Sequence, residues 1–259
     1  MVFFQTRGLT KQFAGLMATN NLDMDVQESE IVGLIGPNGA GKSTVFNMIT
    51  GFFHPTSGTV IFRDEDITQL RADQIARRGI SRTFQAATVF VEDTVFDNAL
   101  AGCHMHCTQP NWKAFLHTSG ARAEEAAIRR KVAGILEFME LTTIADEVAH
   151  NLSHGHQKML ELCIAIASGP KLLLLDEPLT GMNATEKLTM VGKIRELRQR
   201  GMTIMLVEHD MKAVMGLCDR VIVVNYGNKI AEGSPQEIQQ NPEVIQAYLG
   251  KPRERRHAV

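Results

Sequence analysis

Short apolar runs bounded by turn residues recur along this chain, and segments with helical spacing lie between them. The runs are Ile31–Ile35, Ile80–Phe84, Leu172–Leu175, Thr203–Val207 and Val221–Val224. Strands of a parallel sheet have this composition because helices cover both of their faces. The alternation therefore predicts an α/β fold with a mostly parallel core sheet.

The N-terminal part of the chain has a different pattern. Polar and apolar residues alternate in the short segments Val2–Thr6, Leu22–Val26 and Gly58–Phe62. Alternation with period two is typical of strands that bury one face only, as antiparallel strands do. We therefore expect an antiparallel β-subdomain beside the core sheet.

A third region, from about Asp93 to Ala167, lacks strand signals. Apolar residues recur there at helical spacing with charges between them, at Ala127, Val132, Ile135, Leu136 and Met139. This spacing predicts an inserted helical lobe. We expect one domain over residues 1–250, with the core and the antiparallel subdomain in 1–92 and 168–250, the lobe in about 93–167, a loop at 108–120 and a basic mobile tail at 251–259.

Charge and cysteine content narrow the function classes. The formal net charge is −2 and the pI is about 6.5, so the strong positive charge of a nucleic-acid-binding protein is missing and no such partner is expected. Four irregularly spaced cysteines fit a reducing compartment. No secretory signal is visible, and the apolar runs fall short of the ~20 residues of a membrane-spanning helix, so any membrane contact is expected through a partner.

A glycine-rich motif follows the strand expected at Ile31–Ile35. Its residues are Gly36, Pro37, Asn38, Gly39, Ala40, Gly41, Lys42, Ser43 and Thr44. Glycines let successive N–H groups point inward, and the helix that follows adds partial positive charge, so the loop suits a polyphosphate. We expect a P-loop NTPase that binds ATP, with Lys42 at the β- and γ-phosphates and the Ser43 hydroxyl on Mg²⁺.

The apolar run Leu172–Leu175 ends in two carboxylates, Asp176 and Glu177. An acidic pair after a strand is often only a solvated turn. Phosphoryl transfer to water, however, needs an acid near Mg²⁺ and a second group that orients or deprotonates the attacking water. Asp176 fits the first role, acting indirectly on Mg²⁺, and Glu177 fits the second.

In their order along nearly the whole chain, these motifs resemble the ABC transporter ATPase family. The stretch Leu152–Gln157 resembles the family's signature sequence. The resemblance implies that Gln85 ligates Mg²⁺ and water and senses the membrane partner, that His209 contacts the γ-phosphate and that Phe13 stacks on adenine. Taken alone, Gln85 would be any strand-end amide, His209 a satisfied polar residue and Phe13 a core residue.

The resemblance also implies that the signature residues Ser153, His154, Gly155 and His156 complete the site of the facing chain. One chain with one phosphate loop then implies a head-to-tail dimer around two ATP molecules, with a second copy or a related ATPase. Histidines 154 and 156 replace the commoner glycine and glutamine. Asn183 stands where an aspartate is usual. Hydrolysis is still expected, and these departures together bear on its rate and on the communication between subunits.

Three further segments resemble the larger ATPase of bacterial high-affinity branched-chain amino-acid importers. They are Gln74–Gln85, Glu208–Met215 and Asn241–Gly250. The resemblance implies membrane-embedded permease subunits, a periplasmic or extracellular solute-binding protein acting indirectly, and a peripheral position on the cytoplasmic face of the inner membrane. A related urea or amide importer, a lipopolysaccharide exporter, a non-transport ATPase in DNA repair or translation and a nucleotide-dependent scaffold stay open.

The segment Cys103–Cys107 contains two thiols and two imidazoles. On a helix the two cysteines share one face while His104 and His106 point elsewhere, and no second ligand pair follows. We therefore expect no physiological metal site there.

Overall fold

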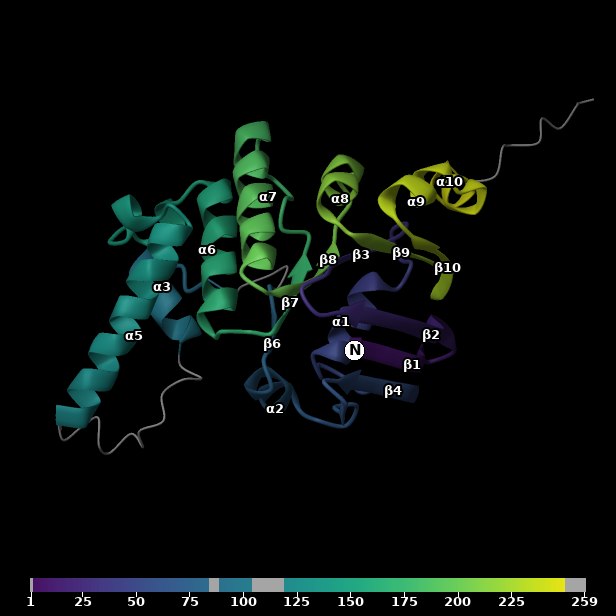
Figure 1. The fold of residues 1–259 in the computed structure, drawn as a ribbon, viewed down its shortest axis with the longest axis horizontal. Coiled ribbons are helices and arrows are strands. Elements are labelled where there is room, and N and C mark those ends of the chain that lie inside the picture. Colours follow the sequence, from purple (N-terminus) through teal and green to yellow (C-terminus); the bar gives the residue numbers. More distant parts are fainter. Residues whose placement is uncertain (1, 84–88, 104–118, 250–259) are drawn as a thin grey trace, which may run out of the picture. The chain divides into compact units, whose positions relative to one another are not determined.

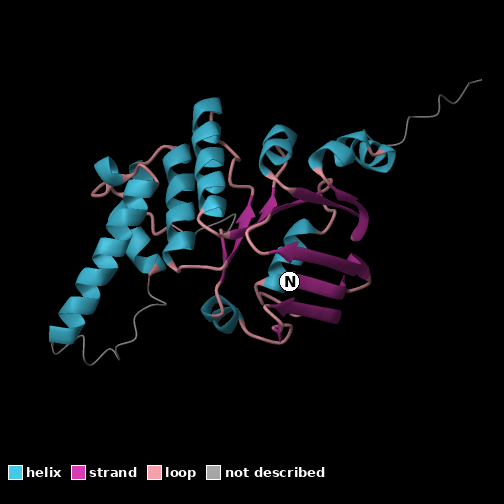
Figure 2. Cartoon of the chain, in the orientation of Figure 1, coloured by secondary structure: helices cyan, strands magenta, loops and turns pink. Residues whose placement is uncertain are grey.

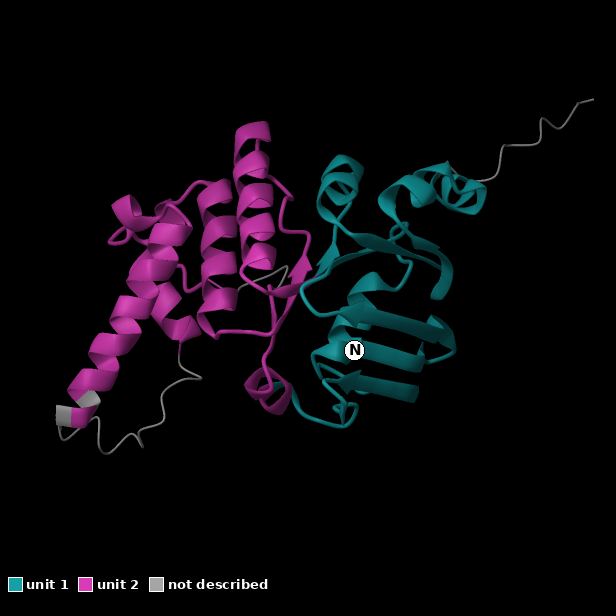
Figure 3. Ribbon diagram, in the orientation of Figure 1, with its two compact units in different colours: residues 1–72, 205–259 teal, residues 73–204 magenta. Residues whose placement is uncertain are grey.

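The computed structural model describes residues 2–83, 89–103 and 119–249. The chain divides into two compact units, one of residues 1–72 with 205–259 and the other of residues 73–204 (Figure 3). One border falls inside strand β8 (Thr203–Val207), so this strand has residues in both units. Each unit is described by itself.

The first unit contains a four-stranded antiparallel sheet with the order β2-β1-β4-β5 (Figure 2). The strands are β1 (Val2–Phe13), β2 (Leu16–Gln27), β4 (Ser57–Phe62) and β5 (Glu65–Asp66). Gln5 of β1 pairs with Asp25 on one side and Ile61 on the other. The predicted antiparallel subdomain is confirmed, and its strands extend beyond the predicted segments.

The first unit also carries the strand order β10-β9-β3-β8. Its strands are β3 (Ile31–Ile35), β8, β9 (Arg220–Asn225) and β10 (Asn228–Gly233), and its helices are α1 (Lys42–Ile49), α8 (Met211–Leu217), α9 (Pro235–Gln240) and α10 (Pro242–Leu249). Strands β3 and β9 are parallel, with Gly33 opposite Val221, and β10 is antiparallel to β9. Every residue of β3 is buried.

The second unit continues the strand order as β8-β7-β6, with β6 and β7 parallel. Its strands are β6 (Ile80–Arg82) and β7 (Leu172–Asp176); its helices are α2 (Ala72–Arg77, of which Ala72 belongs to the first unit), α3 (Val95–Gly102), α5 (Ser119–Phe138), α6 (His154–Ala167) and α7 (Ala184–Gln199), with 3₁₀ turns at Thr142–Ile144 and Ala149–Asn151. Figure 1 shows α3, α5, α6 and α7 gathered in this unit.

The predicted fold class is confirmed, because each of the five apolar runs overlaps a strand of a mostly parallel sheet; of the run 80–84, residues 80–82 form β6 and Phe84 lies outside the described residues. The runs at 31–35 and 203–207 match β3 and β8 at both ends. Helix α5 covers most of the predicted helical pattern; Val132 and Leu136 are buried, whereas Ala127 is exposed, so the buried stripe begins in the second half of the helix.

The predicted lobe 93–167 lies inside the second unit, and its boundaries stay a prediction. The predicted tail 251–259 lies outside the described residues. So does the predicted loop 108–120, apart from its last two positions, which begin α5 and are helical rather than loop. Among the described residues, no helix combines the length and apolar character required to cross a bilayer.

Candidate nucleotide-binding and hydrolysis site

The phosphate loop joins the buried strand β3 to helix α1. Its backbone has positive φ at three glycines, +155° at Gly36, +77° at Gly39 and +103° at Gly41. Gly41 occupies the N-cap of α1 without a side-chain cap, so the first backbone N–H groups of the helix have no capping side chain. The loop therefore directs donors and helix dipole to one place, as a polyphosphate site requires.

Two of these glycines lie against backbone atoms. A Cβ at Gly36 would overlap the carbonyl oxygen of Val224, and a Cβ at Gly41 would overlap the carbonyl oxygen of Ala18. Because both obstacles are main-chain atoms, no side-chain rotation makes room. The loop is thus pressed against β9 and β2, and its course depends on glycine.

Lys42 lies across this loop with only 6% of its surface exposed. Its Nζ donates hydrogen bonds to the carbonyl oxygens of Gly36, at 2.7 Å, and Pro37, at 3.0 Å. The ammonium is therefore held by its own loop. Asn38, Gly39 and Ser43 are exposed, Thr44 is half-buried and Ala40 is buried.

Phe13 ends strand β1 and is 42% exposed, so it is not a core residue. Its ring meets Phe53 edge-on, with 5.3 Å between centroids. The Nζ of Lys11 lies 5.2 Å from the centroid of the Phe13 ring. The exposed part of the ring is available to a planar apolar ligand.

His209 follows β8 and is exposed, whereas its neighbour Glu208 is buried. The Oε2 of Glu208 accepts hydrogen bonds from the backbone N–H groups of His209, at 2.8 Å, and Asp210, at 3.1 Å. Glu208 thereby fixes the backbone that carries His209. Glu208 is not among the residues predicted from the sequence, although it is an acidic residue at the end of an apolar strand, the same signal that identifies Asp176.

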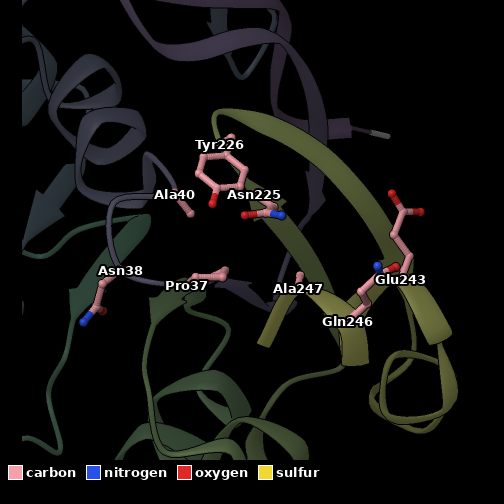
Figure 4. Close-up of a pocket in the computed structure, with 8 residues that line it drawn as sticks. All are labelled: Pro37, Asn38, Ala40, Asn225, Tyr226, Glu243, Gln246 and Ala247. Atoms are coloured by element: carbon pink, nitrogen blue, oxygen red, sulfur yellow. The ribbon is translucent and has the colours of Figure 1, made fainter. Parts of the chain in front are cut away.

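A cavity of about 420 Å³ lies beside the phosphate loop in the first unit (Figure 4). It is lined by Pro37, Asn38, Ala40, Asn225, Tyr226, Glu243, Gln246 and Ala247. Three of the lining residues belong to α10, and Tyr248 of this helix accepts a hydrogen bond from the Gly36 backbone. Burial raises the pKa of the Tyr248 hydroxyl, and this hydrogen bond opposes the rise. The C-terminal helix therefore reaches the phosphate loop, a contact that the sequence pattern did not reveal.

In the second unit, Asp176 is the last residue of β7 and Glu177 follows it directly. Asp176 is 2% exposed, and its Oδ2 pairs with Arg82 Nη2 at 2.6 Å. Its Oδ1 is buried and has no hydrogen-bond partner among the described residues. Glu177 is half-buried in the left-handed region at φ +50°, and the Thr180 hydroxyl donates to its Oε2 at 3.4 Å. A non-glycine residue held in this region is frequent at active sites.

The signature residues lie at the start of α6. Ser153 is the N-cap, and its Oγ accepts from the His156 N–H at 3.2 Å. Gly155 is buried, and a Cβ there would overlap the carboxylate of Glu186. The Nε2 of His154 lies 3.2 Å from the carbonyl oxygen of Thr180. His154 thus contacts the loop that follows Glu177.

Asn183 caps helix α7. Its side chain accepts from the Glu186 N–H at 3.0 Å, and the Glu186 carboxylate accepts from the Asn183 N–H at 2.9 Å. This is a complete capping box, a role that aspartate also fills. Of the three departures from the family pattern, His154 contacts the loop that follows Glu177, and Asn183 ends this loop at the start of α7.

Two of the candidate sites fall partly or wholly outside the described residues. Gln85 lies in 84–88, and His104–Cys107 lie in 104–118. Cys103 is described, and it is buried with its Sγ 3.6 Å from the carbonyl oxygen of Ala167. Across residues 2–83, 89–103 and 119–249, no group of three or more His, Cys, Asp or Glu side chains is placed to hold a metal ion.

Known proteins share both the sequence and the fold. A family model described as "ABC transporter" matches residues 19–180, and one described as "Branched-chain amino acid ATP-binding cassette transporter" matches residues 228–254. The chain is 44% identical to the high-affinity branched-chain amino acid transport ATP-binding protein LivG of Escherichia coli (strain K12), over 94% of this chain and 96% of the relative.

Other relatives cover equally large shares. Identity is 40% to BraF of Pseudomonas aeruginosa, another high-affinity branched-chain amino acid transport ATP-binding protein, over 95% of this chain and 97% of the relative. It is 32% to the lipopolysaccharide export system ATP-binding protein LptB of Acidithiobacillus ferridurans, over 95% and 96%.

Among solved structures, the ADP conformation of MJ1267, an ATP-binding cassette of an ABC transporter, matches with a TM-score of 0.85, 30% identity and coverage of 97% of this chain and all of that one. The predicted resemblance is confirmed: the chain belongs to the ABC transporter family and is one of its ATP-binding cassette ATPases.

Proposed function

We propose that the chain is the ATP-hydrolysing subunit of an importer of branched-chain amino acids, that is leucine, isoleucine or valine. The observation that carries the solute class is the 44% identity to LivG along 94% of the chain. The second family match, at 228–254, falls on β10, α9 and α10 and supports the same class. No residue described above selects the solute, which other subunits would recognise.

In this proposal the phosphate loop and Lys42 bind the ATP phosphates. The backbone N–H groups of Gly36–Thr44 supply donors, and Lys42 exchanges the carbonyl oxygens of Gly36 and Pro37 for the β- and γ-phosphates. Phe13 stacks on adenine with its exposed face. Nucleotide binding therefore replaces contacts that the loop makes with itself.

The residues fit a bound Mg²⁺. The Asp176 Oδ1 is a buried carboxylate oxygen without a partner among the described residues, and the exposed Ser43 supplies a hydroxyl, both hard oxygen donors of the kind Mg²⁺ prefers. Ser43 and Gln85 would ligate the ion directly and Asp176 indirectly. The ion supplies neutralisation of developing phosphate charge.

Glu177 is the group proposed to orient and deprotonate the attacking water. Its left-handed backbone fixes the carboxylate after β7, and the Thr180 hydroxyl holds one oxygen. His209, on the backbone that Glu208 holds, would donate to the γ-phosphate as charge develops there. These two residues, with Gln85 and Lys42, form the proposed catalytic set.

The proposed assembly is a head-to-tail pair around two ATP molecules, formed with a second copy or with a related ATPase. Ser153, His154, Gly155 and His156 lie at the start of α6, where a hydroxyl, backbone N–H groups and the helix dipole meet, and they would act on the nucleotide of the facing chain. Permease subunits would hold the pair peripherally at the cytoplasmic face of the inner membrane, with a solute-binding protein acting indirectly and no nucleic acid partner. The chain would be a single cassette domain over 1–250 with its helical lobe at about 93–167.

The catalytic part of the proposal is tested with Glu177→Gln. We expect fluorescent ATP binding to persist while turnover falls by about 10²–10⁴, the range for a lost acid–base group. The matched control is Glu125→Gln on α5, which removes an exposed carboxylate paired with Arg129 and leaves turnover unchanged. Unchanged turnover in Glu177→Gln contradicts the role of Glu177.

The solute is tested by uptake of radiolabelled leucine, isoleucine and valine into cells lacking this chain. Wild type is expected to restore uptake, whereas Glu177→Gln is not. Restoration of urea or amide uptake alone, of lipopolysaccharide export, or of resistance to DNA damage would each replace the proposed solute class with the corresponding alternative.

A further inference from the structure

Arg82 and Asp176 form a buried ion pair in the second unit. They end the neighbouring parallel strands β6 and β7, where Arg82 pairs in register with Leu174. Arg82 Nη2 donates to Asp176 Oδ2 at 2.6 Å, and the side chains are 6% and 0% exposed. The two charges are thus almost fully removed from water.

The residue after Arg82 fastens the backbone of the same aspartate. Thr83 Oγ1 accepts from the Asp176 N–H at 3.1 Å, and the Thr83 N–H donates to the carbonyl oxygen of Leu174 at 3.0 Å. Arg82, the last residue of β6, therefore holds the carboxylate of Asp176, and Thr83, the next residue, holds its backbone. This leaves the aspartate no freedom to rotate without breaking a buried bond.

Stability alone does not account for this arrangement. A buried ion pair often contributes no more than an apolar pair of the same size, because desolvation offsets the attraction. Leaving the Asp176 Oδ1 buried and without a partner among the described residues adds a further desolvation cost. An oxygen kept in that state points to a ligand that residues 2–83, 89–103 and 119–249 do not supply.

We propose that Arg82 is a positioning residue for Mg²⁺: it holds Oδ2 of Asp176 so that Oδ1 is presented to the hydrated ion. The proposal rests on the role of Asp176 in the proposed function. A guanidinium suits the task because it is always charged and holds a fixed plane.

The test measures nucleotide binding by the full chain, with a fluorescent ATP analogue in EDTA and then during a Mg²⁺ titration. We expect Arg82→Gln to keep its Mg²⁺-free affinity within about twofold and to raise the half-saturating Mg²⁺ concentration about tenfold or more, as the loss of an outer-shell partner does. Arg82→Lys keeps the charge without the planar fork, so we expect about a threefold rise.

The control is Arg220→Gln in the first unit, because Arg220 also pairs with carboxylates, at 2.9 Å from Glu30 and 3.2 Å from Asp25. It is expected to lower thermal stability without moving the Mg²⁺ response. A wild-type Mg²⁺ response in folded Arg82→Gln overturns the proposal, as does an equal shift in Arg220→Gln. If Arg82→Gln does not fold, Arg82→Lys decides.

Asp176→Asn separates this proposal from the function on which it rests. If Asp176→Asn keeps the wild-type Mg²⁺ response, the role of Asp176 is wrong and the Arg82 proposal falls with it. If Asp176→Asn loses the response while Arg82→Gln retains it, only the Arg82 proposal is overturned. Neither readout depends on the transported solute.

Discussion

The phosphate loop of the first unit and the signature segment of the second both depend on glycine, but for different physical reasons. At Gly36 and Gly41 the space for a Cβ is taken by backbone carbonyl oxygens. At Gly155 it is taken by the carboxylate of Glu186. Backbone obstacles are fixed by the sheet, whereas side chains can rotate. In the phosphate loop, positions 36 and 41 therefore permit only glycine. In the signature segment, the residue permitted at position 155 depends on the side chain at position 186.

The largest expected effect is that of Gly36→Ala. The new Cβ would meet the Val224 carbonyl oxygen and the φ of +155° is strained for alanine, so we expect a loss of about 3–5 kcal/mol in the free energy of unfolding. Urea denaturation measures it, and fluorescent ATP binding should be lost at the same time.

Gly39→Ala is the matched control, because its φ is +77° while no atom lies within 4 Å of the added Cβ. Conformational strain alone predicts about 1–2 kcal/mol there. If Gly36→Ala and Gly39→Ala lower the free energy of unfolding equally, the contact with the Val224 carbonyl oxygen contributes nothing. The steric explanation for the glycine at position 36 would then be wrong.

A smaller effect is expected for Gly155→Ala. Residue 155 is helical and free of φ strain, so the cost comes from displacing the Glu186 carboxylate, about 1–3 kcal/mol. In a Glu186→Ala background we expect the same substitution to cost less than about 0.5 kcal/mol, because the obstacle is gone. The double-mutant cycle is read from unfolding free energies.

Glu186→Ala alone should lower the free energy of unfolding by about 1 kcal/mol, because it breaks the capping box of α7. The cost of Gly155→Ala in this background is therefore measured relative to the Glu186→Ala single variant. If Gly155→Ala costs as much with alanine at 186 as with glutamate, the obstacle is backbone after all. The signature segment would then follow the same rule as the phosphate loop.

The same contrast explains what the sequence could predict. Strands β3 and β8 were predicted to the residue because each is a fully buried apolar run, and the phosphate loop was found because its residues are contiguous. The contacts of Arg82 and Tyr248 escaped prediction since they join residues far apart in the chain, 94 positions in the case of Arg82 and Asp176. Register and close approach, which decide such pairs, are properties of the folded sheet.

The roles of Glu208 and Glu186 could not be predicted for a related reason. Both are acidic residues next to a motif, and composition does not tell a solvated carboxylate from one that accepts two backbone N–H groups, as Glu208 does. Glu186 has the spacing of a capping box with Asn183, so the local sequence contained that signal. Its contact with Gly155 was not contained there, because it joins two different helices.

The smallest expected effect is that of Asn183→Asp, which restores the residue usual in the family. An aspartate keeps the acceptor for the Glu186 N–H and gains from the dipole of α7, but it brings a second negative charge close to the Glu186 carboxylate. These terms are similar and opposite, so the free energy of unfolding should change by less than about 0.5 kcal/mol, whereas Asn183→Ala should lose about 1 kcal/mol. Thermal denaturation at low and high salt checks both, since added salt screens the dipole and the repulsion together. A loss for aspartate as large as that for alanine would mean that the repulsion wins, and that asparagine at this position depends on Glu186 in the same way as glycine at 155.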